Sequence, residues 1–166
     1  MIAQHLALDH RDRVAPVLLG CTTAGGRRGA PPWRLMLATA ARPLIGPLRA
    51  FHLVAPLLYS AEPLRHAPER VAADMRIRGQ DLTRVRTTVA QMAAIARHDT
   101  RARLAELVGL PVTVLYGEED VLVPIEHGRD LAGRIPGARL EPVRGAGHLL
   151  STDAEGDTAA AVLSHL

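Results

Sequence analysis

An aspartate and a histidine, each placed after an apolar segment, are the residues of this chain best suited to chemistry. Asp120 follows the apolar residues 110–116, and His148 lies in a glycine-rich stretch after residues 139–143. A carboxylate that fixes the tautomer of an imidazole makes it a general base, and such a pair is two thirds of an acid–base–nucleophile triad. The sequence therefore predicts Asp120 as the orienting acid and His148 as the general base.

The nucleophile of such a triad has no candidate in the sequence. No Gly-x-Ser-x-Gly occurs in the 166 residues, and Ser60, Ser151 and Ser164 lack the glycines that flank a nucleophile on a strand-to-helix turn. The single Cys21 ends an apolar segment, which favours a small buried residue over a catalytic thiol. We expect the acid and the base here without the serine they would serve.

Composition narrows the class of protein. Apolar residues make up 48% of the chain and charged residues 22%, which is typical of one soluble domain. All 20 basic residues are arginine, concentrated in the middle of the chain, but aromatic residues are only 2%, so we expect no nucleic-acid partner. No signal peptide, membrane span, cofactor motif or metal-ligand spacing is visible, and the expected location is the cytoplasm.

Hydrophobic periodicity predicts alternating helices and strands. Helical spacing covers residues 1–10, 125–134 and 153–166, and apolar strands cover residues 14–21, 110–116 and 139–143. Strands joined through helices form a parallel sheet, whose carboxyl ends collect ligands at one edge. The predicted fold class is therefore α/β, with about three parallel strands and with Asp120 and His148 at the same edge.

Residues 27–108, which we call the cap segment, interrupt this pattern. Prolines divide it, and helical spacing recurs at residues 33–41, 68–78 and 83–97. The predicted organisation is a core of residues 1–26 and 109–166 around a helical insertion. We expect Asp99 or Thr100 to cap a helix over residues 101–108, and His98 is a minor candidate for a substrate pocket. The core of the insertion is expected to contain Trp33, Met36, Phe51 and Met92.

Three motifs resemble the α/β-hydrolase family. The sequence Gly117-Glu118-Glu119-Asp120-Val121-Leu122-Val123-Pro124 is similar to its acid loop, Ile135-Pro136-Gly137-Ala138-Arg139-Leu140 to its last helix-to-strand turn, and Gly145-Ala146-Gly147-His148 to its histidine loop. Met1-Ile2-Ala3-Gln4 resembles the start of the helix after the nucleophile elbow. The resemblance is closest to small bacterial hydrolases related to 3-oxoadipate enol-lactonases, cofactor-free haloperoxidases and proline iminopeptidases.

This resemblance implies the C-terminal part of an α/β-hydrolase sheet with a helical cap. The intact enzyme would hydrolyse a small ester, lactone or amide by a Ser-His-Asp mechanism, with the serine about four residues before Met1. The alternative is a non-catalytic remnant or an interaction subunit that needs the missing half. In either case the strand over residues 14–21 is expected to have an open edge, through which the chain could self-associate.

Overall fold

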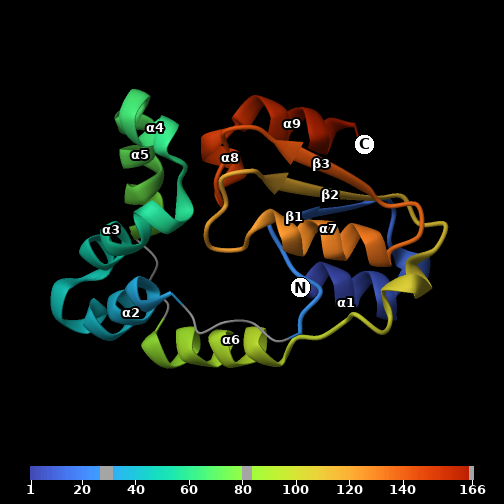
Figure 1. Ribbon diagram of the computed structural model, residues 1–166. Helices are drawn as coiled ribbons and strands as arrows, with labels where there is room; N and C mark the ends of the chain where they lie inside the picture. The colour runs from blue at the N-terminus through green and yellow to red at the C-terminus, as the bar shows by residue number, and fades with distance from the viewer. Residues whose placement is uncertain (27–31, 80–83, 165–166) are drawn as a thin grey trace.

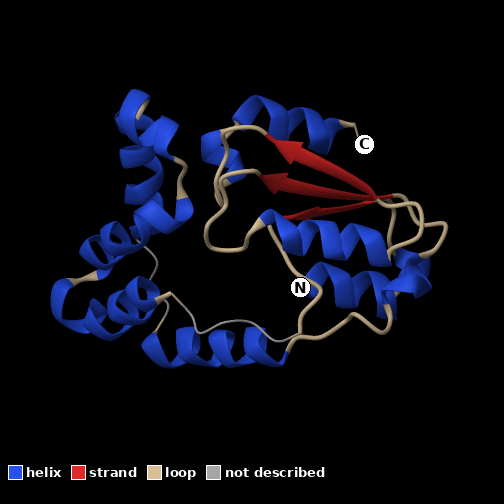
Figure 2. Cartoon of the chain, viewed as in Figure 1, coloured by secondary structure: helices blue, strands red, loops and turns tan. Residues whose placement is uncertain are grey.

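The computed structural model describes residues 1–26, 32–79 and 84–164. Figure 1 shows a sheet with helices on both faces and, beside it, a group of helices supplied by the cap segment. Helices and strands are separated by type in Figure 2, where the three strand arrows run in the same direction. The described part of the chain is therefore an α/β structure, as predicted.

The sheet consists of β1 (Val17–Gly20), β2 (Val112–Gly117) and β3 (Arg139–Val143) in the order β1-β2-β3. Both pairings are parallel, with Val17 opposite Val112 and Gly117 opposite Val143. The strand predicted over residues 14–21 begins later, at Val17. Val14 instead closes the 3₁₀ turn η1 (Arg11–Arg13) by donating to the carbonyl of Arg11, and Pro16 has no N–H for the ladder.

All six residues of β2 are buried because helices cover both faces of the sheet. On one face Val114 and Tyr116 pack with Ala7 of α1 (Ile2–Asp9) and Leu131 of α7 (Ile125–Arg134). On the other face Leu115 packs against α8 (Leu150–Asp153) and α9 (Glu155–Leu163). A strand buried on both faces explains the continuous apolar run from which it was predicted.

The prediction of a single helix over residues 153–166 is wrong at its start. The chain forms two helices, α8 and α9, because Ala154 between them leaves the helical region with φ −140° and ψ 64°. The last described helix ends at Leu163, and residues 165–166 lie outside the described residues.

The described part of the cap segment contains five α-helices: α2 (Trp33–Ile45), α3 (Pro47–Leu58), α4 (Ala61–His66), α5 (Pro68–Gly79) and α6 (Val85–Arg97). Spacing predicted α2, α5 and α6 but missed α3 and α4; Thr83, where the third pattern began, lies outside the described residues. Of the expected cap core, Phe51 packs against buried residues, whereas Trp33 is 68% exposed and Met36 51% exposed. Within the described residues, each helix is too short or too polar to cross a membrane.

A buried polar cluster joins α1 to Thr23, which precedes the cap segment, and to His98 and Thr100 near the end of that segment. His98 Nε2 lies 3.1 Å from both Gln4 Oε1 and the carbonyl oxygen of Thr23, and the Thr100 hydroxyl donates to Gln4 Oε1 at 2.7 Å. His98 is thus a buried member of this junction. The predicted helix over residues 101–108 is only the 3₁₀ turn η2 (Leu104–Leu107), although Asp99 accepts a hydrogen bond from the Arg101 N–H, as a cap would.

Candidate active site

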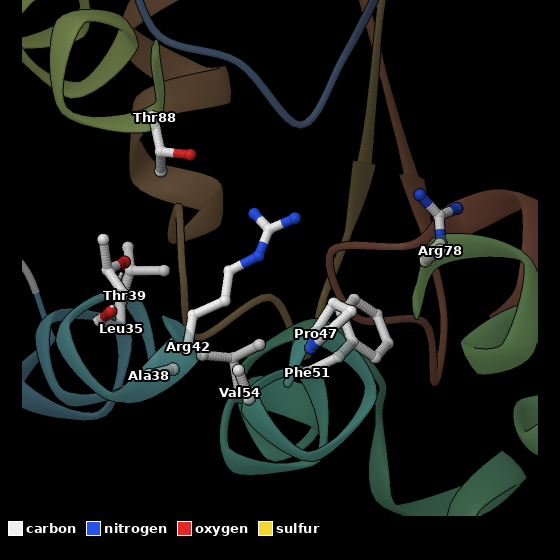
Figure 3. Close-up of a pocket in the computed structure, with 10 residues that line it drawn as sticks. Leu35, Ala38, Thr39, Arg42, Pro47, Phe51, Val54, Arg78 and Thr88 are labelled. Atoms are coloured by element: carbon white, nitrogen blue, oxygen red, sulfur yellow. Dashed lines mark hydrogen bonds between the residues drawn. The ribbon is translucent and has the colours of Figure 1, made fainter. Parts of the chain in front are cut away.

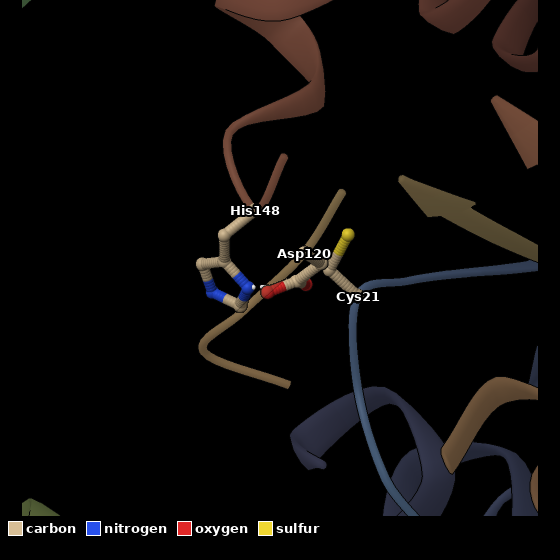
Figure 4. A group of neighbouring side chains, drawn as sticks. All are labelled: Cys21, Asp120 and His148. Carbon is tan, nitrogen blue, oxygen red and sulfur yellow. Dashed lines mark hydrogen bonds and ion pairs between the residues drawn. The ribbon is translucent and has the colours of Figure 1, made fainter. Parts of the chain in front are cut away.

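The carboxyl ends of the three strands place the side chains of a cysteine, an aspartate and a histidine together. Cys21 directly follows β1, Asp120 lies just beyond β2, and His148 lies in the loop after β3. Figure 4 shows the three side chains converging from three separate segments. Parallel strands bring residues that are distant in sequence to one edge of the sheet, and this placement was predicted for Asp120 and His148.

Asp120 holds the imidazole of His148 by one carboxylate oxygen. Oδ2 lies 2.8 Å from His148 Nδ1, while Oδ1 accepts hydrogen bonds from the N–H groups of Leu122 at 2.9 Å and Val123 at 2.8 Å. Because an ionised carboxylate only accepts, Nδ1 is assigned the proton, and the lone pair lies on Nε2. Asp120 is buried whereas the His148 side chain is 24% exposed, so the imidazole can reach a ligand that its acid cannot.

Close backbone contact holds the acid loop, residues 117–124, against the histidine loop, residues 144–149. The Glu119 N–H donates to the carbonyl of Ala146 at 2.9 Å. A Cβ atom on Gly117 would lie 2.2 Å from the carbonyl oxygen of Gly147 and 2.3 Å from that of Ala146. Only glycine fits at position 117, so the end of β2 contributes to the geometry of the pair.

Gly145 and Gly147 of the histidine loop require glycine for different reasons. Gly145 has φ +70°, in the left-handed region that favours glycine, as expected for a tight turn. Gly147 does not have a positive φ; it is small because a Cβ there would lie 2.8 Å from the backbone nitrogen of Ser60. The sequence suggested a turn at both positions but gave no sign of this contact with the cap segment.

Cys21 is the third member of the cluster. Burial raises the pKa of its thiol to about 12, and the neighbouring Asp120 carboxylate adds to the effect. Ligand atoms of Cys21, Asp120 and His148 lie within 4.8 Å of one another, so these are the described residues that could together hold a metal ion. A metal would need the thiolate and would compete with the Nδ1–Oδ2 hydrogen bond, and both requirements work against it.

The serines of the described residues do not complete the triad. Ser60 precedes α4, Ser151 lies in α8 and Ser164 follows α9, so none stands on a strand-to-helix turn. Among the described residues, His148 makes its side-chain hydrogen bond through Nδ1 to Asp120. Nε2 is therefore the atom at which a nucleophile or a substrate would have to approach.

A small cavity lies within the cap segment, away from the Asp120–His148 pair. Its volume is about 160 Å³, and it lies among α2, α3, α5 and α6. In Figure 3 the guanidinium of Arg42 extends across this space from α2. No residue of the acid loop or histidine loop lines this cavity, so it is not part of the Asp120–His148 site. The residues that line it are Leu35, Ala38, Thr39, Arg42, Pro47, Ala50, Phe51, Val54, Arg78 and Thr88.

Asp153 is the site residue that sequence reasoning missed, because it was interpreted only as the start of a terminal helix. Its Oδ2 atom accepts hydrogen bonds from the N–H groups of Gly147 at 2.7 Å and Ser60 at 2.8 Å. The one available signal was its position five residues after His148, where a carboxylate could fold back onto the histidine loop.

Comparison with known proteins agrees with this architecture. No family model matches the chain. The chain is 29% identical over 145 residues to the protein of Caulobacter vibrioides named as carbamate hydrolase RutD, covering 86% of this chain and 52% of the relative. An alpha/beta hydrolase enzyme from a Medee basin deep-sea metagenome library superimposes with a TM-score of 0.80 at 17% identity, covering 99% of this chain and 60% of that one. The chain therefore has the α/β-hydrolase fold.

An enol-lactonase from Burkholderia xenovorans LB400 is a second structural match within this fold. Its TM-score is 0.80 at 24% identity, covering 98% of this chain and 60% of the lactonase. The resemblance drawn from the acid and histidine loops is thus confirmed, as is the partial parallel sheet of three strands. The chain spans about half the length of the curated relatives it matches.

Proposed function

We propose that this chain supplies the acid and the base of a serine-type hydrolase that cleaves a small ester, lactone, amide or carbamate. Asp120 orients His148, and Nε2 of His148 takes the proton from a serine hydroxyl as the oxygen attacks the acyl carbon. The same nitrogen then gives that proton to the leaving group. The serine and the oxyanion-hole donors would come from sequence outside these 166 residues.

The observation that carries this proposal is the geometry of the pair. A buried carboxylate bonded to Nδ1 at 2.8 Å leaves Nε2 as the proton acceptor of a partly exposed imidazole. Two backbone N–H groups hold the other oxygen of Asp120, so the carboxylate cannot rotate freely away from the ring. The relatives named as carbamate hydrolase and enol-lactonase support an acyl-transfer substrate class, since both names describe attack on a carbonyl group.

The test begins with the coding sequence upstream of the Met1 codon. An in-frame Gly-x-Ser-x-Gly followed directly by Met1 is expected, and the protein that includes it should hydrolyse some of a panel of nitrophenyl esters, lactones and carbamates. Asp120→Asn should lower kcat by about 10⁴-fold, because the imidazole then loses its fixed tautomer. His148→Ala should lower it at least as much. Undiminished turnover in either variant would remove the assigned roles.

A second function is favoured by the open edge of the sheet. In the described structure β1 pairs with β2 alone, and Ile2 of the neighbouring α1 is 87% exposed. Such an edge fits a non-catalytic chain that binds another polypeptide. A stop codon or a frameshift upstream of Met1, with no elbow, would favour this alternative over the enzyme.

A further inference from the structure

Both chain neighbours of His148 are tied to the same short stretch of the cap segment. The Leu149 N–H donates to the carbonyl of Leu58, the last residue of α3, at 2.9 Å. The Gly147 N–H donates to Asp153 Oδ2 at 2.7 Å, and the Ser60 N–H donates to the same oxygen at 2.8 Å. His148 therefore lies between two anchor points that both lead to residues 58–60.

This contact is too close to be incidental. The backbone of Gly147 approaches the cap segment so nearly that an added Cβ would lie 3.1 Å from the carbonyl carbon of Tyr59. Tyr59 and Ser60 are themselves buried, with exposed fractions of 4% and 3%. A third bond runs beside it, from Arg70 Nη2 of α5 to the carbonyl of Thr152 at 2.6 Å. Movement of this part of the cap segment must therefore move the histidine loop.

The carboxylate of Asp153 stands in a costly environment for a purely structural link. Burial raises its pKa, although the two N–H donors on Oδ2 favour the ionised form. Its other oxygen, Oδ1, and Oγ of Ser60 are buried without a well-formed hydrogen bond among the described residues, although the Ser60 side chain also acts to lower the Asp153 pKa. A buried polar atom without a full hydrogen bond lowers stability, so Asp153 stabilises the fold less than a carboxylate with both oxygens fully bonded would.

We propose that Asp153 is a positioning residue: by joining the backbone amides of Ser60 and Gly147 through one oxygen, it makes the orientation of His148 depend on the place of the cap segment. The position of α3 and α4 is thereby transmitted to the imidazole that Asp120 holds. Its consequence for catalysis rests on the proposed function of His148, whereas the coupling itself does not. A cap that holds its ligand in place would then also hold the base in place.

The experiment is nuclear magnetic resonance of the ¹⁵N-labelled chain with Asp153→Asn, which keeps the shape of the side chain and removes its charge. Hydrogen bonds to a charged group are strong, so the amide protons of Gly147 and Ser60 should exchange about ten- to a hundredfold faster in the variant. The ring nitrogens of His148 should lose the pattern of a fixed Nδ1–H tautomer. A structural role alone would leave that ring pattern unchanged.

Asp157→Asn is the matched control, because Asp157 is exposed on α9 and the substitution changes the charge equally. Ser60→Ala tests the backbone bridge apart from the Ser60 side chain, since it removes Oγ and keeps the N–H that donates to Asp153. Both should leave the His148 ring signals as they are. Unchanged ring signals and unchanged exchange in a folded Asp153→Asn variant would overturn the proposal.

A measurement on the unsubstituted chain covers the case in which Asp153→Asn fails to fold. Amides that open together exchange with the same free energy and the same urea dependence. Ser60, Gly147 and Leu149 should form one such group, and independent exchange of Ser60 would refute the coupling. None of these readouts uses turnover, so they can succeed when the assigned catalytic role of His148 fails, and the reverse also holds.

Discussion

At the scale of single residues, Cys21 is the side chain whose chemistry depends most on its surroundings. It follows β1 with φ +40°, and its Sγ atom lies 3.9 Å from the carbonyl oxygen of Gly147. Burial raises its pKa to about 12, with the charge of Asp120 acting in the same direction. Although it lies beside an acid–base pair, the thiol is therefore protonated at neutral pH and is a poor nucleophile.

The first prediction concerns alkylation of this thiol. At pH 8 the native chain should react with iodoacetamide about a thousandfold more slowly than the urea-unfolded chain, because only the thiolate reacts and an unfolded cysteine has a pKa of about 8.5. The rate in the native chain should still rise with pH above 10. Mass spectrometry measures the modification, and rapid modification of native Cys21 at pH 8 would contradict the prediction of a protonated, shielded thiol.

At the scale of elements, the junction of β2 with the histidine loop depends on one missing side chain. Gly117→Ala would place a Cβ 2.2 Å from the carbonyl oxygen of Gly147 and 2.3 Å from that of Ala146, and backbone atoms cannot move aside as a flexible side chain can. We expect Gly117→Ala to lower the free energy of unfolding by more than about 2 kcal/mol in urea titrations.

Gly133 of α7 is the matched control for that substitution, since an added Cβ there meets nothing within 4 Å. Gly133→Ala should instead raise the free energy of unfolding by about 1 kcal/mol, because alanine favours the helix. Equal effects of the two substitutions would show that the close contact at Gly117 contributes nothing to stability.

Asp74 joins two helices of the cap segment and gives a prediction of pH dependence. Its Oδ2 atom accepts from the Tyr59 hydroxyl at 2.6 Å, at the end of α3, and from Arg78 Nε of α5 at 2.8 Å. Burial acts to raise the pKa of Asp74, but these hydrogen bonds outweigh it and the pKa is lowered. The stabilisation is therefore present above the unfolded pKa of about 4 and is lost as the pH falls through the lower, folded value.

Asp74→Ala should lower the free energy of unfolding by about 1–3 kcal/mol at pH 7, and by progressively less as the pH falls below 4. Tyr59→Phe should cost less, because the bond from Arg78 remains. Thermal melts at several pH values measure both effects, with the exposed Asp157→Ala as the control. A loss for Asp74→Ala that stays constant down to pH 2 would be inconsistent with the lowered pKa.

The elements also show why some of the fold could be predicted from the sequence. The bounds of α7 and β3 match their predicted ranges, because turn residues separate each from its neighbours. In the cap segment, prolines do not mark the ends of helices as the sequence suggested. Pro43 lies in the last turn of α2 and Pro56 in the last turn of α3, whereas Pro47 and Pro68 begin helices. A proline costs little at the first position of a helix, so its presence alone does not mark a break.

The site was predictable only where its contacts follow from sheet topology. Asp120 and His148 meet because parallel strands end at one edge, which periodicity reveals. The bridge from Asp153 to Ser60 and Gly147 uses backbone N–H groups, which every residue but proline carries. No residue type or spacing in the cap segment indicates such a contact, so only the folded chain could reveal it.

At the scale of the whole molecule, β1 has one edge without a partner strand among the described residues. Val17 and Cys21 donate their N–H groups to the carbonyls of Pro111 and Leu115, so the alternate residues Leu18 and Gly20 direct theirs away from β2. Beside this edge, Ile2 is 87% and Leu6 50% exposed on α1. Unpaired strand groups next to an apolar flank are a template for another strand.

We therefore expect the chain to associate through β1, with a weight-average mass in sedimentation equilibrium that rises with concentration. Gly20→Lys should reduce this association, because a lysine on an edge strand opposes pairing with a second strand and because a Cβ at Gly20 meets only Leu150 Cδ1, at an ordinary 3.9 Å. Gly133→Lys adds the same charge on α7, away from the edge, and should leave association unchanged. If the unsubstituted chain stays monomeric at every concentration and melts cooperatively, the three-stranded sheet is stable alone and β1 needs no partner strand.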